Sequence, residues 1–239
     1  MKNNANILLV HGAWADGTCW SKVLLLLRAK GYNVTAAQIP LTSLADDIAV
    51  TQRLLSAQKG PTILVGHSYG GAVVTGAATG MSQVKGLVYI TAFGLDAGES
   101  LASLSKQGPP SPGSTAIEPD DKGYLWINRE KFHSAFAADA TDDEAYVMAA
   151  VQRPLGMASF TGEETTPAWK TIPSWYLVCT DDKMIPPPAQ EFMAKRMGAT
   201  VRSVASSHAA FMSRPQAVAD LIALAAESVV AMPAEMAAR

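Results

Sequence analysis

Cysteines and long apolar runs are both scarce in this sequence. No apolar run approaches the roughly 20 residues that a membrane-spanning helix needs. The only cysteines among 239 residues are Cys19 and Cys179, which excludes a disulfide framework, and we interpret both as reduced structural thiols. Residues 1–6 are polar and the apolar run Ile7–Val10 is too short for a signal peptide. The sequence therefore predicts a cytoplasmic protein without a membrane partner.

The chain also lacks a large excess of positive or negative charge. The chain has 19 basic and 21 acidic residues, a formal net charge of -2. Because the chain has no excess of positive charge, we do not expect nucleic acid or an anionic membrane as a partner. With 49% hydrophobic and only 17% charged residues, the chain can bury a large core and is not expected to be disordered. Its length allows one large α/β domain or two small ones.

Short β-rich runs alternate with helical stretches along most of the chain. The strand candidates are mostly continuously apolar, as expected of strands that are covered on both faces. They are Ile7–Val10, Asn33–Ala37, Thr62–Val65, Leu87–Ile90, Trp175–Cys179 and Thr200–Val204. Helices are expected over 20–27, 44–55, 188–198 and 218–229, the second of them capped by Ser43. This alternation predicts an α/β protein with a mostly parallel six-stranded sheet and helices on both faces.

One segment, residues 94–173, breaks this alternation. Proline and glycine are frequent near its start, and aromatic residues recur along it. A segment this long cannot be a plain loop, and its aromatic side chains require burial. We expect a helical cap (lid) over one end of the sheet, inserted into a core formed by residues 1–93 and 174–239. A disordered excursion is the alternative.

The most informative motif is Gly66-His67-Ser68-Tyr69-Gly70. The apolar run 61–65 precedes it and the small residues 71–78 follow it, which indicates a strand, a sharp turn and a helix with the serine at the apex. A residue at such an apex has a strained backbone, and its side chain projects away from the sheet. We predict that Ser68 is a nucleophile.

A serine nucleophile needs an adjacent base, and the chain has only four histidines. The side chain of His67 is expected to point away from the serine, and His11 to shape the backbone after the first strand. His133 is expected to be a surface residue or to pack in the cap. His208 follows the last strand, at the carboxyl edge of the sheet, where ligands bind in open α/β sheets. We therefore predict that His208 is the base.

The imidazole in turn needs a carboxylate that fixes its tautomer. Asp181 and Asp182 both follow the strand 175–179 directly, and the order serine, acid, histidine is that of enzymes with a serine at a strand–turn–helix apex. The oxyanion of the intermediate needs two backbone donors. We expect one from Tyr69, after the serine, and the other from the loop Gly12-Ala13-Trp14. These residues alone leave the choice between the two acids open.

Four motifs together resemble the α/β-hydrolase family: Leu8–Trp14, Gly66–Gly71, Cys179–Pro186 and Ser207-His208. They look most like its small capped branch, which contains plant methyl esterases, hydroxynitrile lyases and bacterial relatives. The resemblance implies an α/β-hydrolase fold with a helical cap insertion.

The resemblance also implies roles for single residues. In this family the acid usually stands four residues before a proline, which selects Asp182 by counting back from Pro186. Cys179 replaces the usual glycine, so Asp181 stays a second choice. The oxyanion amides fall on Ala13 and Tyr69. The lyase members carry a lysine directly after the catalytic histidine, where this chain has Ala209, which disfavours lyase chemistry.

We predict a serine hydrolase that cleaves small or aromatic carboxylic esters through an acyl-enzyme, with Ser68, His208 and Asp182 as its triad. The expected partner is a small ester; no cofactor and no metal is expected. The predicted apolar pocket consists of Trp14, Met184, Ile185, Phe211 and Met212. The alternatives are a lyase or other non-hydrolytic enzyme on the same triad, a small-molecule receptor on a hydrolase scaffold, and a haloperoxidase-like or lactone-cleaving enzyme. The oligomeric state is open, with a homodimer as one alternative.

Overall fold

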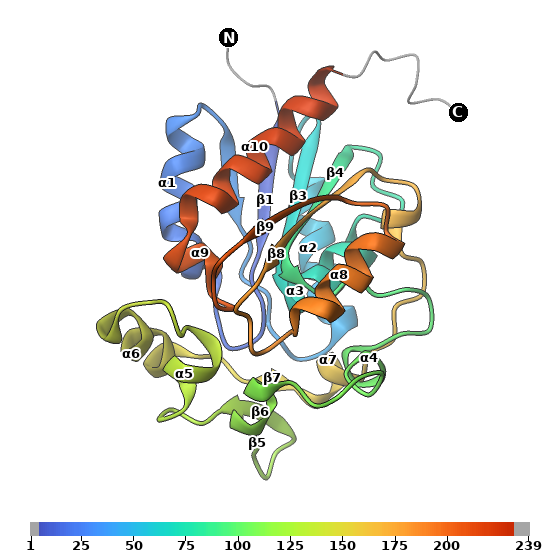
Figure 1. Cartoon of the computed structure of the whole chain (residues 1–239). Helices are drawn as coiled ribbons and strands as arrows, with labels where there is room; N and C mark the ends of the chain where they lie inside the picture. The colour runs from blue at the N-terminus through green and yellow to red at the C-terminus, as the bar shows by residue number, and fades with distance from the viewer. Residues whose placement is uncertain (1–4, 232–239) are drawn as a thin grey trace.

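The fold is centred on one six-stranded sheet, seen in a computed structural model that describes residues 5–231 (Figure 1). Residues 1–4, which begin the polar N-terminal stretch, and residues 232–239 lie outside the described part. The strand order is β2-β1-β3-β4-β8-β9, and every neighbouring pair is parallel. The strands are β1 (Asn6–Val10), β2 (Asn33–Ala36), β3 (Thr62–Ser68), β4 (Val84–Ala92), β8 (Ser174–Cys179) and β9 (Thr200–Val204). The predicted α/β fold with a parallel six-stranded sheet is confirmed.

Burial follows the position of each strand in the sheet. Every residue of β1, β3 and β8 is buried, because helices cover both faces of these central strands, and this explains their uninterrupted apolar runs. At the two edges, β2 and β9 keep exposed or half-buried residues.

Helices lie on both faces of the sheet. In Figure 1, α10 (Pro215–Ala231) crosses in front of the strands, beside α1 (Ser21–Ala29), and α2 (Leu44–Ser56) and α3 (Tyr69–Ala77) lie behind them. The predicted cap of α2 is present, since the Ser43 side chain accepts a hydrogen bond from the Asp46 amide. A fifth helix, α8 (Pro187–Arg196), begins at a proline and ends before Gly198, which has a φ of 61°.

Residues 94–173, called the insertion below, lie between β4 and β8, and most of them lie at the carboxyl ends of the strands (bottom of Figure 1). Besides helices it contains a small antiparallel sheet in the order β5-β6-β7, which the sequence analysis does not predict. Its elements are α4 (Leu101–Leu104), η2 (Pro112–Ala116), β5 (Ile117–Pro119), β6 (Tyr124–Ile127), α5 (Phe132–Phe136), α6 (Asp142–Val151), β7 (Leu155–Gly156), α7 (Met157–Thr161) and η3 (Ala168–Lys170). In the core, η1 (Gly17–Trp20) precedes α1.

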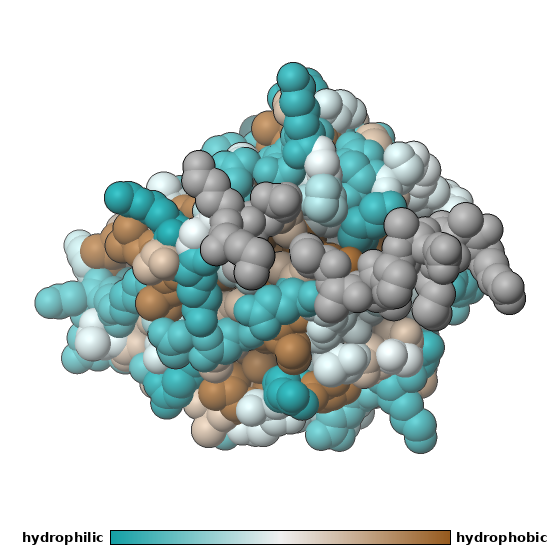
Figure 2. All heavy atoms as spheres, turned by 90° about the horizontal axis from the view of Figure 1, so that it is seen from above, coloured by the Kyte–Doolittle hydropathy of each residue, from teal (hydrophilic) through white to brown (hydrophobic). Residues whose placement is uncertain are grey.

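The opposite end of the molecule carries a mixed surface. In the view from above (Figure 2), hydrophilic side chains separate the hydrophobic areas that can be seen. Across residues 5–231, none of the helices combines the length and the apolar character that crossing a bilayer demands.

Candidate active site

Ser68 lies at a sharp turn between β3 and α3. Its φ of 51° and ψ of -123° lie in a region that non-glycine residues rarely adopt. The turn is possible because Gly66 has no side chain: a Cβ there would collide with the carbonyl oxygen of Gly70. This strained geometry is typical of a turn that presents a reactive side chain at the end of a strand.

Three loops converge at the same edge of the sheet as this turn. The loops after β1, β8 and β9 carry Gly12, Asp182 and His208, and all three strands run parallel to β3. The loops after β8 and β9 are joined by a hydrogen bond of 3.1 Å from the Asp181 amide to the Ser206 carbonyl. The carboxyl edge of a parallel sheet is where open α/β folds bind ligands.

The centre of the site is a buried pair of His208 and Asp182. Nδ1 of His208 lies 2.7 Å from Oδ2 of Asp182, and neither side chain is exposed to solvent. The adjacent Asp181 is exposed and has no contact of this kind with the imidazole. The Asp182 carboxylate can only accept a hydrogen bond, so the neutral imidazole of His208 carries its proton on Nδ1. Its Nε2 is then left with a free lone pair.

Nε2 of His208 is buried and has no hydrogen-bond partner among the described residues. The Ser68 hydroxyl is therefore not bonded to it in this structure. Hydrogen bonds between a nucleophile and its base are often long or misaligned before substrate binds. A buried acceptor without a partner is rare in folded proteins and calls for an explanation such as catalysis.

Asp182 is held by further donors that sequence reasoning missed. Its Oδ1 accepts from the amides of Met184 at 2.7 Å and Ile185 at 3.1 Å. Its Oδ2 accepts from the Thr91 hydroxyl and, at 3.2 Å, from Nε2 of Gln190. These donors fix the carboxylate and stabilise its negative charge. Thr91 lies in β4, 91 residues from the acid, so no local pattern could indicate it. Gln190 is only eight residues away, in α8, but no motif in the sequence analysis marks it.

The other two buried histidines, His67 and His11, form hydrogen bonds with backbone groups. Nε2 of His67 bonds to the carbonyl oxygen of His208 at 2.8 Å, and burial holds the pKa of His67 well below its usual value. Nε2 of His11 accepts from the Ile39 amide at 3.2 Å, and burial lowers the pKa of His11 to about 4. Both rings are therefore neutral at pH 7. The contact from His67 positions the loop that carries His208.

The two predicted oxyanion donors lie at the start of α3 and in the loop after β1. Tyr69 is the first residue of α3 and is fully buried, and Ala13 is 2% exposed. The next amide in the loop, that of Trp14, already donates to the carbonyl oxygen of Arg153 at 3.1 Å. The amide of Trp14 is therefore not free to bind an oxyanion.

Replacing Gly12 with alanine is expected to lower both the melting temperature and the turnover of esters. A Cβ there would lie 2.7 Å from Cβ of Ser68 and 2.9 Å from Nδ1 of His67, so the turn would have to shift. Overpacking of this kind costs about 1–3 kcal/mol, and each kcal/mol lowers the melting temperature of a chain of this size by about 2–4 °C. Thermal unfolding and steady-state kinetics measure the two effects.

The matched control is Gly108→Ala, since a Cβ at Gly108 would meet no atom within 4 Å. We expect this variant to behave like the wild type. A Gly12→Ala variant with unchanged stability and turnover would contradict the close approach of the loop to the nucleophile turn.

The insertion places aromatic side chains next to the predicted triad residues. The ring centroid of Phe136, in α5, lies 4.9 Å from that of His208 and 6.4 Å from that of Trp14. Nε1 of Trp14 donates to the Leu125 carbonyl in β6 at 2.8 Å. Ser68, the predicted nucleophile, is only 4% exposed to solvent.

The predicted pocket residues lie in different surroundings. Ile185 and Phe211 are buried, and the ring of Phe211 meets that of His67 edge-on at 4.8 Å. Met184 is half-buried, and its sulfur packs against Gly113 of the insertion. Met212 is half-buried on α9 (Ala210–Ser213), and its carbonyl oxygen accepts from Lys22. Phe136 was not in the predicted set, because its distance from the triad along the chain hides the contact.

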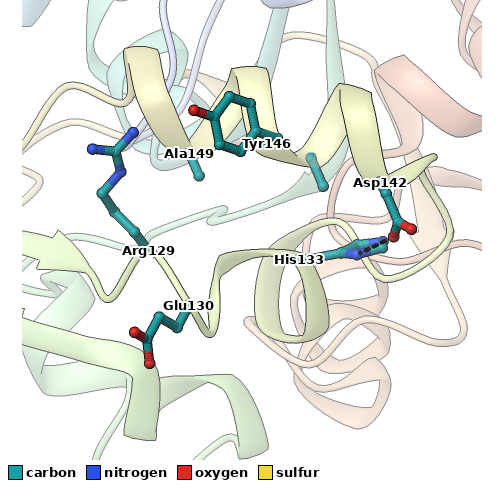
Figure 3. A pocket seen from close by; sticks show the side chains of 7 residues that line it. Arg129, Glu130, His133, Asp142, Tyr146 and Ala149 are labelled. Atoms are coloured by element: carbon teal, nitrogen blue, oxygen red, sulfur yellow. Dashed lines mark ion pairs between the residues drawn. The ribbon is translucent and has the colours of Figure 1, made fainter.

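A separate hollow of about 440 Å³ lies on the insertion, between α5 and α6. Figure 3 shows Arg129 at one end of it, the ion pair of His133 and Asp142, 3.2 Å apart, at the other, and Tyr146 between them. Nε2 of His133 also lies 3.1 Å from the Ala140 carbonyl. Both nitrogens of His133 are thus engaged within the insertion, and this hollow contains no serine with an adjacent base.

No metal centre is apparent. Within residues 5–231, no three or more His, Cys, Asp or Glu side chains are grouped so that they could hold a metal ion. The two cysteines are free thiols, and burial raises the pKa of both.

The chain belongs to the Alpha/beta hydrolase family, which residues 7–221 match. It is 29% identical to the pyrethroid hydrolase of Sphingobium wenxiniae, over 91% of this chain and 86% of that protein. It is 24% identical to methylesterase 1 of Arabidopsis thaliana, over 96% of this chain and 98% of that protein. These matches confirm the predicted resemblance to a branch that contains plant methyl esterases.

Solved structures agree with this assignment. The crystal structure of a pyrethroid hydrolase from Sphingobium faniae superposes on this fold with a TM-score of 0.82 and 25% sequence identity. The superposition covers 96% of this chain and all of that one. The protein is therefore a hydrolase of the α/β-hydrolase type.

Proposed function

We propose that the protein hydrolyses carboxylic esters through an acyl-enzyme formed on Ser68. The observation that carries this proposal is the buried His208, whose Nδ1 is bound to Asp182 and whose Nε2 is unpartnered, in a loop at the same sheet edge as the strained Ser68 turn. In this arrangement Nε2 of the buried His208 is free to accept the proton of the Ser68 hydroxyl.

In the first half of the reaction, Nε2 of His208 takes the proton of the Ser68 hydroxyl as its oxygen attacks the acyl carbon. The carbonyl π bond becomes an oxyanion, which the amides of Ala13 and Tyr69 bind. Collapse of this intermediate breaks the bond to the alkoxy group, which leaves as an alcohol with the proton from His208. Asp182 stabilises the imidazolium that exists between these steps.

In the second half, water takes the place of the alcohol. His208 accepts a proton from the water as its oxygen attacks the acyl carbon, and a second oxyanion forms at the same amides. Its collapse releases a carboxylic acid and returns the proton to Ser68. Each oxyanion donor of this kind is typically worth about 2.7–4 kcal/mol in the transition state.

Small or aromatic esters are the substrates that the surroundings favour. The ring of Phe136 lies next to His208 and meets that of Trp14, and the predicted pocket residues Met184 and Ile185 donate their amides to Asp182. Two relatives, a pyrethroid hydrolase and a methylesterase, carry names that describe hydrolysis. We propose that the insertion acts as a cap that shapes this apolar pocket.

A fluorophosphonate label combined with a panel of esters and lactones tests the proposal. We expect the label to form a covalent adduct that peptide mass spectrometry places on Ser68, and to block turnover of the same esters. A labelled serine other than Ser68 would overturn the assignment. Cyanide release from mandelonitrile would indicate a lyase instead, and stoichiometric ligand binding with negligible turnover would indicate a receptor.

A further inference from the structure

The side chain of Tyr69 makes a buried contact with a carboxylate on another helix. Its phenol oxygen donates to Oδ2 of Asp47, in α2, at 2.5 Å. Both residues are completely buried, and the phenol and the carboxylate are engaged with each other. The contact joins α2 to the residue directly after the proposed nucleophile.

Asp47 gathers donors from two more segments. Its Oδ1 accepts from the Leu41 amide at 2.8 Å, in the turn before α2 where Leu41 has a φ of 63°. Its Oδ2 also lies 3.5 Å from the hydroxyl of Ser159, in α7 of the insertion. Asp47 thus fixes the Tyr69 phenol against a frame made from the core and the insertion.

A buried carboxylate is a costly way to hold two helices together. None of the ion pairs within residues 5–231 includes Asp47, and burial raises its pKa to about 6. Above pH 7 most molecules therefore keep a buried negative charge that has hydrogen-bond donors but no cationic partner within residues 5–231. An apolar pair of similar volume would often stabilise the fold as well or better. The cost indicates a role in orientation rather than in stability.

The amide of Tyr69 needs such orientation. Tyr69 is the first residue of α3, and the first N–H groups of a helix have no acceptor within the helix. Hydrogen bonding in the helix therefore does not fix the direction of this amide. The residue before it, Ser68, has a strained backbone. If the phenol is released, the turn can shift and lower this strain.

We propose that Asp47 is a positioning residue that holds the Tyr69 phenol and thereby aims the Tyr69 amide at the oxyanion. This inference rests on the proposed ester hydrolysis. Since the oxyanion exists only during reaction, the alignment should affect kcat and leave substrate binding almost unchanged.

The test uses Tyr69→Phe, Asp47→Asn and the double variant, assayed with p-nitrophenyl acetate above pH 7. We expect each single variant to lower kcat by about tenfold with KM changed by less than about twofold. Because both substitutions break one interaction, the double variant should lose little more than either single variant.

The matched control is Tyr89→Phe. Tyr89 is also fully buried, and its phenol bonds at 2.8 Å to the hydroxyl of Thr75, which lies further along α3 than Tyr69. We expect this variant to lose stability and to keep its kcat.

Two outcomes would overturn the inference. In one, Tyr69→Phe and Asp47→Asn lower the melting temperature as Tyr89→Phe does but leave kcat unchanged, which makes the contact merely structural. In the other, the losses add fully in the double variant. Tyr69→Phe removes only one oxygen, so it decides the question if Asp47→Asn does not fold. A wild type without ester turnover would refute the proposed function itself, which is a distinguishable result.

Discussion

Replacing Ser68 with alanine is expected to lower the turnover of p-nitrophenyl acetate by about 10⁴-fold or more. Loss of a serine nucleophile removes the acyl-enzyme route and leaves only the residual contributions of the oxyanion amides and of binding. Steady-state kinetics on a preparation free of host esterases measures the loss. The melting temperature should change little, because alanine keeps the Cβ that already occupies the strained turn.

Ser105→Ala is the matched control for this substitution. Ser105 is exposed at the end of α4, outside the loops that converge at the site, and the variant should keep wild-type turnover. Full activity in a clean preparation of Ser68→Ala would defeat the nucleophile assignment.

The second large effect is expected from Asp182→Asn. The carboxylate contacts Nδ1 of His208 and accepts four further hydrogen bonds. An amide can present its NH₂ group to Nδ1, which selects the wrong tautomer and leaves the imidazolium without a negative partner. In a Ser-His-Asp triad this change lowers kcat by about 10⁴-fold, and we expect a loss of about 10³-fold or more, measured as kcat for p-nitrophenyl acetate.

Asp181→Asn distinguishes the two adjacent acids. Asp181 is exposed, and only its backbone amide bonds to the neighbouring loop. Its charge should therefore matter little, and kcat should stay within about twofold of the wild-type value. A larger loss in Asp181→Asn than in Asp182→Asn would reverse the assignment of the acid.

Local sequence patterns predicted most of the core. All six strands of the large sheet were expected, because central strands that are covered on both faces leave uninterrupted apolar runs such as 62–65. The sequence also predicts the cap of α2 at Ser43, because a capping side chain contacts an amide only three residues away. The small sheet of the insertion was not predicted. Its strands have only two to four residues, and β7 pairs with β6 across the stretch that contains α5 and α6.

The same distinction between local motifs and long-range contacts applies to the site. Ser68 and the two adjacent acids could be found because each stands next to a strand end in a short motif. The Thr91 contact to Asp182 and the Asp47 contact to Tyr69 join residues from different elements, so no spacing in the sequence indicates them. Burial of the His208 side chain likewise depends on Phe136, a residue of the insertion.

The insertion occupies the place of one crossover between the neighbouring parallel strands β4 and β8. Such a connection only has to return the chain to the other end of the sheet, and its length costs little free energy. Residues can thus be gained, lost or exchanged over most of this stretch while Leu87 and Ser174 keep their pairing. Substrate preference can consequently diverge among descendants of such a chain, while the reacting groups on the sheet stay in place.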